Sequence, residues 1–156
     1  MRVGIGYDVH RFGEGRRLVL GGVEFDGETG LVGHSDADVV THAVMDALLG
    51  AAGKGDIGDH YPDDDPSFEN AESIGLLGRM IEALAGWSVV NVDVTVIAER
   101  PRLGPHKQRM AERLTDAMQV QAACVNVKAT TSEGMGFVGR GEGIAALAVA
   151  QIRQDA

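Results

Sequence analysis

The first segment of the chain, residues 2–12, alternates between apolar residues and small or polar ones. The apolar positions are Val3, Ile5, Tyr7 and Val9. The intervening positions are Gly4, Gly6, Asp8 and His10. A period of two predicts a β-strand, so Asp8 and His10 project from the same face of it.

A helical period follows the next loop. Its apolar positions are Val39, Val40, Ala43, Val44, Ala47 and Leu48. We expect Ser35 to cap this helix, with Asp38 completing a capping box and Gly50 and Gly53 as stop signals. Asp38, His42 and Asp46 then share one flank, so a carboxylate lies one turn away on each side of His42 and would orient its ring. An acidic helix surface without a ligand role would have the same pattern.

The other segments are predicted from the same two periods and from turn residues. They are a hairpin at 17–25 with its turn at Gly21 and Gly22, an irregular acidic loop at 54–66, a helix at 71–85, a strand at 88–98, a helix from Pro105 to Met118, a strand at 125–131, a glycine-rich loop at 132–143 and a strand at 144–152. This alternation predicts one α/β (α+β) domain, residues 1–156, with β-α-β units on a mixed sheet and helices packed on one face.

Composition limits the function classes. The chain has 156 residues and a net charge of -9, with few aromatic residues and no basic run, which disfavours nucleic-acid binding. No apolar run reaches the ~20 residues of a membrane span, and no signal-peptide pattern opens the chain. Cys124 is the single cysteine, which suits a reducing compartment, so we expect a cytoplasmic protein.

Asp8 and His10 on the strand and His42 on the helix offer two nitrogens and one oxygen. Three such ligands with an open fourth position are typical of a catalytic zinc site. An Asp-x-His pair at a strand end is alone more typical of a turn cap or a surface pair. The proximity of His34 and Asp38 in the sequence favours the metal interpretation.

The loops contain further polar chemistry. The glycine-rich loop matches neither a P-loop nor a dinucleotide fingerprint. Residues 130–132 carry hydroxyls, Glu133 can ligate a hard cation and Arg140 can bind a phosphate, although a hydroxyl-rich turn with a surface salt bridge would have the same pattern. Asp56 lies between glycines that allow close approach to a ligand, whereas residues 63–65 would bind a cation or substrate hydroxyls or be simply solvated.

Five motifs occur in order: GYDVH at 6–10, GHSDAD at 33–38 with His42 and Asp46, GDIG at 55–58, NVKATT at 126–131 and GRGEG at 139–143. Together they resemble the 2-C-methyl-D-erythritol 2,4-cyclodiphosphate synthases of the non-mevalonate isoprenoid pathway, over essentially the whole chain. The resemblance implies a phosphorus-oxygen lyase of the bacterial cytosol. It would cyclise 4-diphosphocytidyl-2-C-methyl-D-erythritol 2-phosphate and release CMP.

The resemblance also implies roles for single residues. Asp8, His10 and His42 would hold one zinc ion per subunit beside the substrate, and Glu133 would bind magnesium or manganese with the diphosphate. His34 and Thr131 would stabilise the transition state. The methylerythritol and phosphate contacts would come from His34, Ser35, Asp56, Ile57, Gly58, Tyr61, Pro62, Asp63, Asp64 and Asp65. The cytidine pocket would comprise Ala98, Glu99, Arg100, Pro101, Arg102, Leu103 and Gly104 with Thr130, Thr131 and Ser132.

At the level of assembly, the resemblance implies a homotrimer with three active sites between subunits. Phe137 and Arg140 would lie near the substrate and near a central cavity, where an isoprenoid diphosphate would bind. The chain departs from the family pattern at Arg102, where a lysine is common, and at Gly104, where a larger side chain often packs. Arginine and lysine are not equivalent in phosphate contacts.

Two other classes of function remain compatible with the residues. A zinc-dependent phosphohydrolase would use the same ligands to activate water and would release inorganic phosphate. A non-catalytic trimer that binds isoprenoid diphosphates would lose nothing measurable on replacement of His34 or Thr131. A zinc deaminase is disfavoured because the H-x-E and P-C-x-x-C signature is absent.

Overall fold

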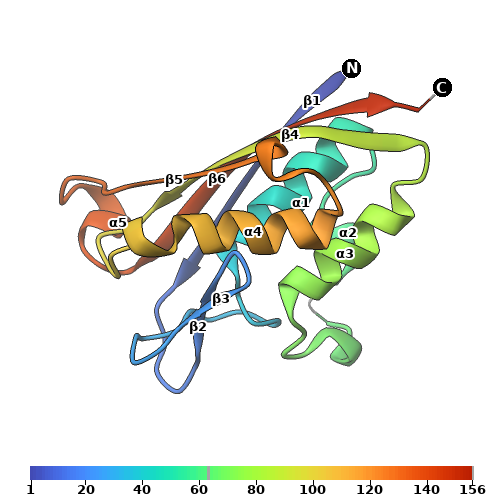
Figure 1. Ribbon diagram of the computed structural model, residues 1–156. Coiled ribbons are helices and arrows are strands. Elements are labelled where there is room, and N and C mark those ends of the chain that lie inside the picture. Colours follow the sequence, from blue (N-terminus) through green and yellow to red (C-terminus); the bar gives the residue numbers. More distant parts are fainter. Residues whose placement is uncertain (63, 156) are drawn as a thin grey trace.

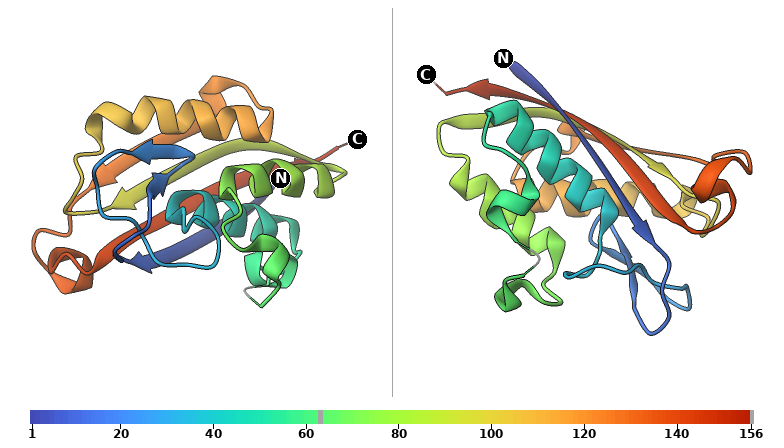
Figure 2. Two further views of the ribbon diagram at one scale, coloured as in Figure 1. Left: turned by 90° about the horizontal axis from the view of Figure 1, so that it is seen from below. Right: turned by 180° about the vertical axis from the view of Figure 1, so that it is seen from behind.

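The computed structural model describes residues 1–62 and 64–155, and its largest sheet has four strands in the order β1-β6-β4-β5 (Figure 1). They are β1 (Arg2–Arg11), β4 (Trp87–Ile97), β5 (Val125–Thr130) and β6 (Gly143–Gln154). β6 pairs antiparallel with β1 and β4, whereas β4 and β5 are parallel. The sheet is therefore mixed, as predicted, and the parallel pair is joined through a helix. Because Arg2 pairs with Ile152, the two chain ends lie side by side (Figure 2).

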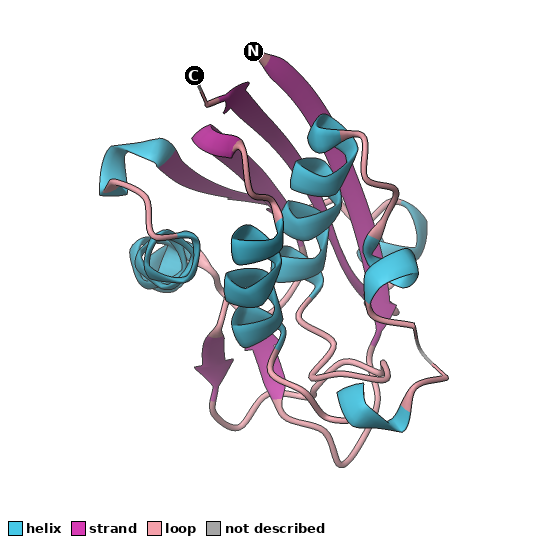
Figure 3. Ribbon diagram, turned by 90° about the vertical axis from the view of Figure 1, so that its right-hand side faces the viewer, coloured by secondary structure: helices cyan, strands magenta, loops and turns pink. Residues whose placement is uncertain are grey.

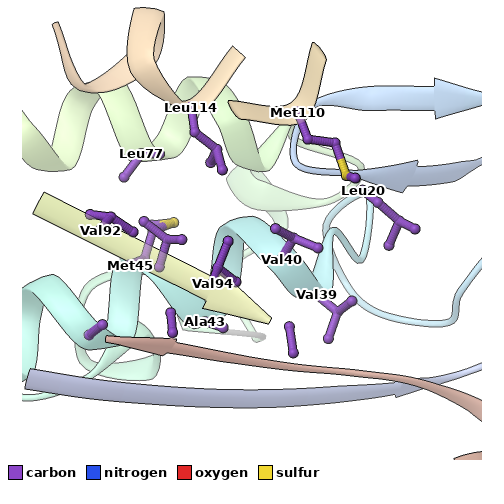
Figure 4. Packing of buried hydrophobic residues seen from close by; sticks show 14 of the residues in the cluster. Leu20, Val39, Val40, Ala43, Met45, Leu77, Val92, Val94, Met110 and Leu114 are labelled. Carbon is purple, nitrogen blue, oxygen red and sulfur yellow. The ribbon is translucent and has the colours of Figure 1, made fainter. Parts of the chain in front are cut away.

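Three helices cover one face of this sheet: α1 (Val39–Ala52), α3 (Ser73–Ala83) and α4 (Lys107–Met118) (Figure 3). Their apolar stripes meet the sheet in one core, in which Val40 and Ala43 of α1, Leu114 of α4 and Val94 of β4 are fully buried (Figure 4). The prediction of helices on a single face is confirmed. No helix of the described residues is long and apolar enough to cross a membrane.

The opposite face of the sheet leaves apolar side chains in solvent. Val3 and Ile5 of β1 are 61% and 68% exposed, and Tyr7 beside them is 51% exposed. Leu147 and Val149 of the neighbouring β6 continue this surface. An exposed apolar patch of this kind is typical of a protein–protein contact.

Two glycines of β1 let α1 lie directly on the strand. A Cβ atom on Gly6 would lie 1.9 Å from the carbonyl oxygen of Ala43, and one on Gly4 would lie 2.1 Å from that of Ala47. Any larger residue would therefore collide with the helix backbone. Asp8 and His10 continue the same face of β1, so the close contact carries both side chains toward the first turn of α1.

The start of α1 differs from the prediction. The helix begins at Val39 and its N-cap is Asp38, so the capping box from Ser35 is wrong. The Asp38 carboxylate is completely buried and accepts the backbone N–H groups of Val40 and Thr41 at 3.1 Å. It also accepts two N–H groups at 2.7 Å from the hairpin turn, so it joins the hairpin to the helix. A carboxylate with two oxygens can satisfy both groups of donors, whereas a serine hydroxyl cannot.

That hairpin consists of β2 (Leu18–Leu20) and β3 (Val23–Phe25), with Gly21 and Gly22 at its turn as predicted. The acidic segment is less irregular than predicted. It contains the short helix α2 (Ile57–His60), because Asp56 and Asp59 form a capping box, and it ends where the 3-10 turn η1 (Pro66–Phe68) begins. Pro105 lies in the 3-10 turn η2 (Gly104–His106) before α4. The remaining short elements are η3 (Ala122–Cys124) and α5 (Gly136–Gly139), which lies within the glycine-rich loop.

Candidate functional site

Asp8, His10 and His42 converge between the end of β1 and the first turn of α1. Asp8 Oδ2 lies 3.0 Å from His10 Nε2 and 3.0 Å from His42 Nδ1. The two ring nitrogens are 3.3 Å apart. The side chains are 25%, 18% and 12% exposed in that order, so all three are largely removed from water. The structure thus brings together the three residues that the sequence singled out, in an arrangement that could hold a metal ion.

The ring of His10 is oriented by the backbone. Its Nδ1–H donates to the Val32 carbonyl oxygen at 2.7 Å, which leaves the electron pair of Nε2 facing Asp8 and His42. Three atoms that can each offer an electron pair therefore surround one point. Such a group is unfavourable unless a proton or a cation lies between its members. The donor set, two imidazoles and a carboxylate, fits zinc.

The electrostatics of the cluster favour an ionised carboxylate. Burial alone would raise the pKa of the Asp8 carboxyl, but hydrogen bonds and charge from His10 and His42 hold that pKa well below its usual range. Burial would lower the pKa of His10, whereas the Asp8 carboxylate and the Val32 carbonyl raise it. The Asp8 carboxylate is therefore available as an anionic ligand for a cation at this site.

The predicted pair of carboxylates beside His42 is wrong. Asp38 points away from the imidazole to cap α1, and Asp46 accepts the backbone N–H of Ile57 at 2.8 Å. His42 Nε2 instead lies 2.8 Å from the Ser73 hydroxyl oxygen and 3.1 Å from that of Ser35. Ser73 was not identified from the sequence, because it is thirty-one residues away and only the packing of α3 beside α1 brings it to the ring.

A pocket of about 200 Å³ opens over the cluster. Besides the three candidate ligands, it is lined by Gly33, His34, Ser35, Ile57, Gly58, Tyr61, Phe68 and Leu76. Most residues expected around the methylerythritol group are therefore here or in the adjoining loop, where His34 Nε2 lies 2.9 Å from the Asp65 carbonyl oxygen. Asp56 caps α2. Pro62 and Asp64 belong to the same loop, and Asp63 lies outside the described residues. A larger hollow of about 550 Å³ near Trp87 contains none of the candidate residues.

The residues expected around cytidine and the second cation form a separate group. Residues 98–104 and 130–133 follow the carboxyl ends of the parallel strands β4 and β5, and Ala98 N–H donates to the Thr130 carbonyl at 3.0 Å. The Glu99 carboxylate accepts the backbone N–H of Ser132 at 2.9 Å, and the Thr131 hydroxyl donates to Glu133 at 2.6 Å. None of these residues lines the pocket over the Asp8 cluster.

Phe137 and Arg140 lie at the other end of the glycine-rich loop, in and just after α5. Phe137 is 38% exposed, and Arg140 Nε donates to Glu142 at 2.6 Å on the surface. The surface salt bridge that the sequence analysis gave as an alternative for this loop is therefore present. It leaves the remaining guanidinium nitrogens of Arg140 available to an anion.

Comparison with protein families places residues 1–153 within the YgbB family model. The 2-C-methyl-D-erythritol 2,4-cyclodiphosphate synthase of Desulfosudis oleivorans is 58% identical over 158 residues, covering 99% of this chain and 94% of that protein. The enzyme of the same name from Pelotomaculum thermopropionicum is 56% identical over 156 residues, with 99% and 96% coverage. The similarity therefore extends over whole proteins.

Solved structures agree with this. The bifunctional IspDF of Campylobacter jejuni superimposes with a TM-score of 0.94 at 43% identity, and the match covers 99% of this chain and 42% of that one. The chain thus spans less than half of the bifunctional protein. A CDP-bound 2C-methyl-D-erythritol-2,4-cyclodiphosphate synthase superimposes with a TM-score of 0.85 at 35% identity, covering 97% of this chain and 100% of that one.

Proposed function

The chain belongs to the YgbB family and has 2-C-methyl-D-erythritol 2,4-cyclodiphosphate synthase activity, and we propose that the reaction takes place at the pocket around Asp8, His10 and His42. The activity is that of a CMP-releasing lyase in the non-mevalonate pathway. The observation that supports this location is the convergence of three electron-pair donors at the base of a pocket next to His34 and Ser35.

The reaction is an internal displacement. An oxygen of the 2-phosphate forms a bond to the β-phosphorus of the cytidine diphosphate arm. The bond between that phosphorus and the bridging oxygen breaks, and CMP leaves with the bridging oxygen. No water is consumed, so the protein has to position the two phosphates and stabilise their charge.

We assign the metal site to one zinc ion per subunit, held by Asp8, His10 and His42. A zinc ion there supplies the positive charge that polarises the phosphate under attack. His34 and Ser35 line the same pocket, and the Ser35 hydroxyl would donate a hydrogen bond to that phosphate. His34 would act with Thr131 in stabilising the transition state.

The walls of the pocket favour ring closure over hydrolysis. Ile57, Tyr61, Phe68 and Leu76 line it with apolar surface, and the Tyr61 hydroxyl is engaged with the Leu76 carbonyl oxygen at 3.2 Å. A substrate that fills this pocket leaves little room for an attacking water molecule. The geometry therefore supports the cyclisation better than the phosphohydrolase alternative.

We further propose that a complete active site is formed between two copies of the chain in a homotrimer. Two observations support this. The cytidine group at 98–104 and 130–132 does not line the pocket of the Asp8 cluster, so a neighbouring chain would supply it. The open apolar face of β1 and β6 offers a surface for such a neighbour. Glu133 would bring a magnesium or manganese ion to the diphosphate across the same boundary.

The remaining assignments concern the surroundings of the trimer. Phe137 and Arg140 would line a central cavity that binds an isoprenoid diphosphate. The aromatic ring suits the apolar isoprenoid chain, and the guanidinium suits the diphosphate. The nucleotide substrate is water-soluble and Cys124 is the single cysteine, so we place the reaction in the cytoplasm.

The test compares metal content and product in one set of variants. We expect His42→Ala to lose bound zinc and CMP release together, while phosphorus NMR shows cyclic diphosphate only with the unchanged chain. His106→Ala is the matched control, because His106 packs outside the cluster, against Phe25, with the ring centres 4.6 Å apart and the ring planes tilted by 48°. Full CMP release by a zinc-free His42→Ala protein would overturn the metal role. Release of inorganic phosphate in place of CMP would favour the hydrolase.

A further inference from the structure

His42 can bind a metal through Nδ1 only when its proton is on Nε2. Nδ1 faces Asp8 Oδ2 at 3.0 Å, whereas Nε2 points to the other side, toward the Ser73 hydroxyl at 2.8 Å. A neutral imidazole carries one proton and places it on either nitrogen, depending on its partners. In the metal-free protein the Asp8 carboxylate can accept a proton from Nδ1. When a cation takes that place, the proton has to lie on Nε2, so the group beside Nε2 must be able to accept it.

A serine hydroxyl alone does not decide this, since it can either donate to Nε2 or accept from it. At Ser73 the choice is made by Asp36, whose Oδ1 accepts the Ser73 hydroxyl proton. Asp36 Oδ2 also accepts the Ser73 backbone N–H at 3.1 Å. A carboxylate has no proton to give, so the Ser73 hydroxyl donates to Asp36 and keeps its lone pairs for His42.

The backbone around these residues holds the pair in place. Asp36 N–H donates to the Ala71 carbonyl at 3.1 Å, and Asn70 N–H donates to the His34 carbonyl at 2.9 Å. The Arg16 guanidinium donates to the Gly33 carbonyl at 3.0 Å. Ser73 itself is completely buried at the start of α3, so no solvent competes for its hydroxyl.

Among residues 1–62 and 64–155, the second hydroxyl beside the ring has no carboxylate partner. Ser35 Oγ is 3.1 Å from His42 Nε2, 3.3 Å from Ser73 Oγ and 3.3 Å from the Ala37 backbone nitrogen. None of these contacts forces the direction of its proton. Its longer distance and its place in the pocket suit a contact with substrate, which leaves the orientation of His42 to Ser73.

We propose that Asp36 and Ser73 are positioning residues that act through His42: the chain Asp36–Ser73–His42 holds the imidazole in the Nε2–H tautomer and directs Nδ1 to the metal. The inference rests on the proposed zinc site. Hydrogen-bond partners of metal-bound histidines fix the tautomer and raise ligand basicity, and their loss costs ~10- to 100-fold in metal affinity.

Zinc affinity, measured by competition with a chromogenic chelator, tests the proposal directly. We expect Ser73→Ala and Asp36→Asn to weaken zinc binding by ~10- to 100-fold. In Asp36→Asn the side-chain amide has only one acceptor oxygen, whereas Ser73 presents two donors, its hydroxyl and its backbone N–H. The matched control is Ser88→Ala, because Ser88 donates to Asp155 in the same type of pair at the other end of the sheet. Its zinc affinity should equal that of the unchanged chain.

Nitrogen-15 NMR of the zinc-loaded protein separates positioning from a general loss of structure. We expect a slowly exchanging Nε2–H signal from His42 in the unchanged chain and its loss or rapid exchange in Ser73→Ala, at an unchanged far-ultraviolet circular dichroism spectrum. If the unchanged chain binds zinc and both variants bind it equally well, the chain of hydrogen bonds is refuted and the zinc site stands. If the unchanged chain binds no zinc, the proposed metal site fails as well.

Discussion

Replacing Gly6 by alanine tests whether the close contact of β1 and α1 forms the proposed metal site. The new Cβ would lie 1.9 Å from the Ala43 carbonyl oxygen, where ordinary contact begins at 3.4 Å, so the helix has to retreat by about 1.5 Å. Ala43 follows His42 directly, and the imidazole moves with it. We expect overpacking to cost about 1–3 kcal/mol of unfolding free energy. A misplacement of ~1 Å at a reacting centre can cost ~100-fold in rate.

The assays are urea unfolding of the metal-free protein, zinc affinity by chelator competition and the rate of CMP release. Gly4→Ala is the matched variant, since its Cβ would lie 2.1 Å from the Ala47 carbonyl, one turn farther from His42. Both variants should lose stability, whereas Gly6→Ala should lose more zinc affinity. A Cβ atom on Gly50, in the same helix, would meet open space, so Gly50→Ala should raise the unfolding free energy by ~0.5–1 kcal/mol. Native stability and zinc affinity in Gly6→Ala would refute the reasoning.

Three further predictions concern other parts of the molecule. Asp38→Ala should lose ~2–4 kcal/mol of unfolding free energy in urea titrations, because it removes a helix cap and leaves buried N–H groups unpaired; a loss below ~0.5 kcal/mol would contradict the structural role of Asp38. If the proposed trimer forms through this face, Ile5→Glu should convert it to monomers in sedimentation runs and abolish CMP release at unchanged zinc content per chain; a stable, active trimer of the variant would exclude this face as the interface. Glu133→Gln should raise the magnesium concentration needed for half-maximal CMP release while zinc content stays the same, and an unchanged requirement would remove Glu133 from the proposed second metal site.

The sequence predicted the sheet and the candidate ligands because both follow from local periods. A strict two-residue alternation places Asp8 and His10 on one face, and a helical stripe places His42 opposite the buried side of α1. The final strand, called from an apolar run after a glycine turn, is likewise confirmed as β6. The identity of the substrate was predicted from the resemblance to a family, because hydrophobic periodicity carries no information about a substrate.

The parts that could not be predicted depend on contacts distant in the sequence. Asp38 was assigned to the flank of His42 because helical spacing alone places it there, whereas four N–H groups, two of them from the hairpin, turn it inward. Ser73 meets His42 only through the packing of α3. The Asp8 cluster and the residues at 98–104 and 130–133 form two separate groups because of the order of the strands in the sheet. Local sequence patterns do not determine that order.

The pairing of β1 with β6 has a consequence for how such a chain can be joined to other proteins. Both ends leave the sheet together near Arg2 and Ile152, whereas His10 lies eight residues farther along β1, or about 26 Å at the usual rise per residue. A partner enzyme fused at either end would therefore extend from the pole opposite the pocket and leave its entrance open. The bifunctional protein of Campylobacter jejuni, in which the part matched by this chain makes up 42% of the length, is compatible with such an arrangement.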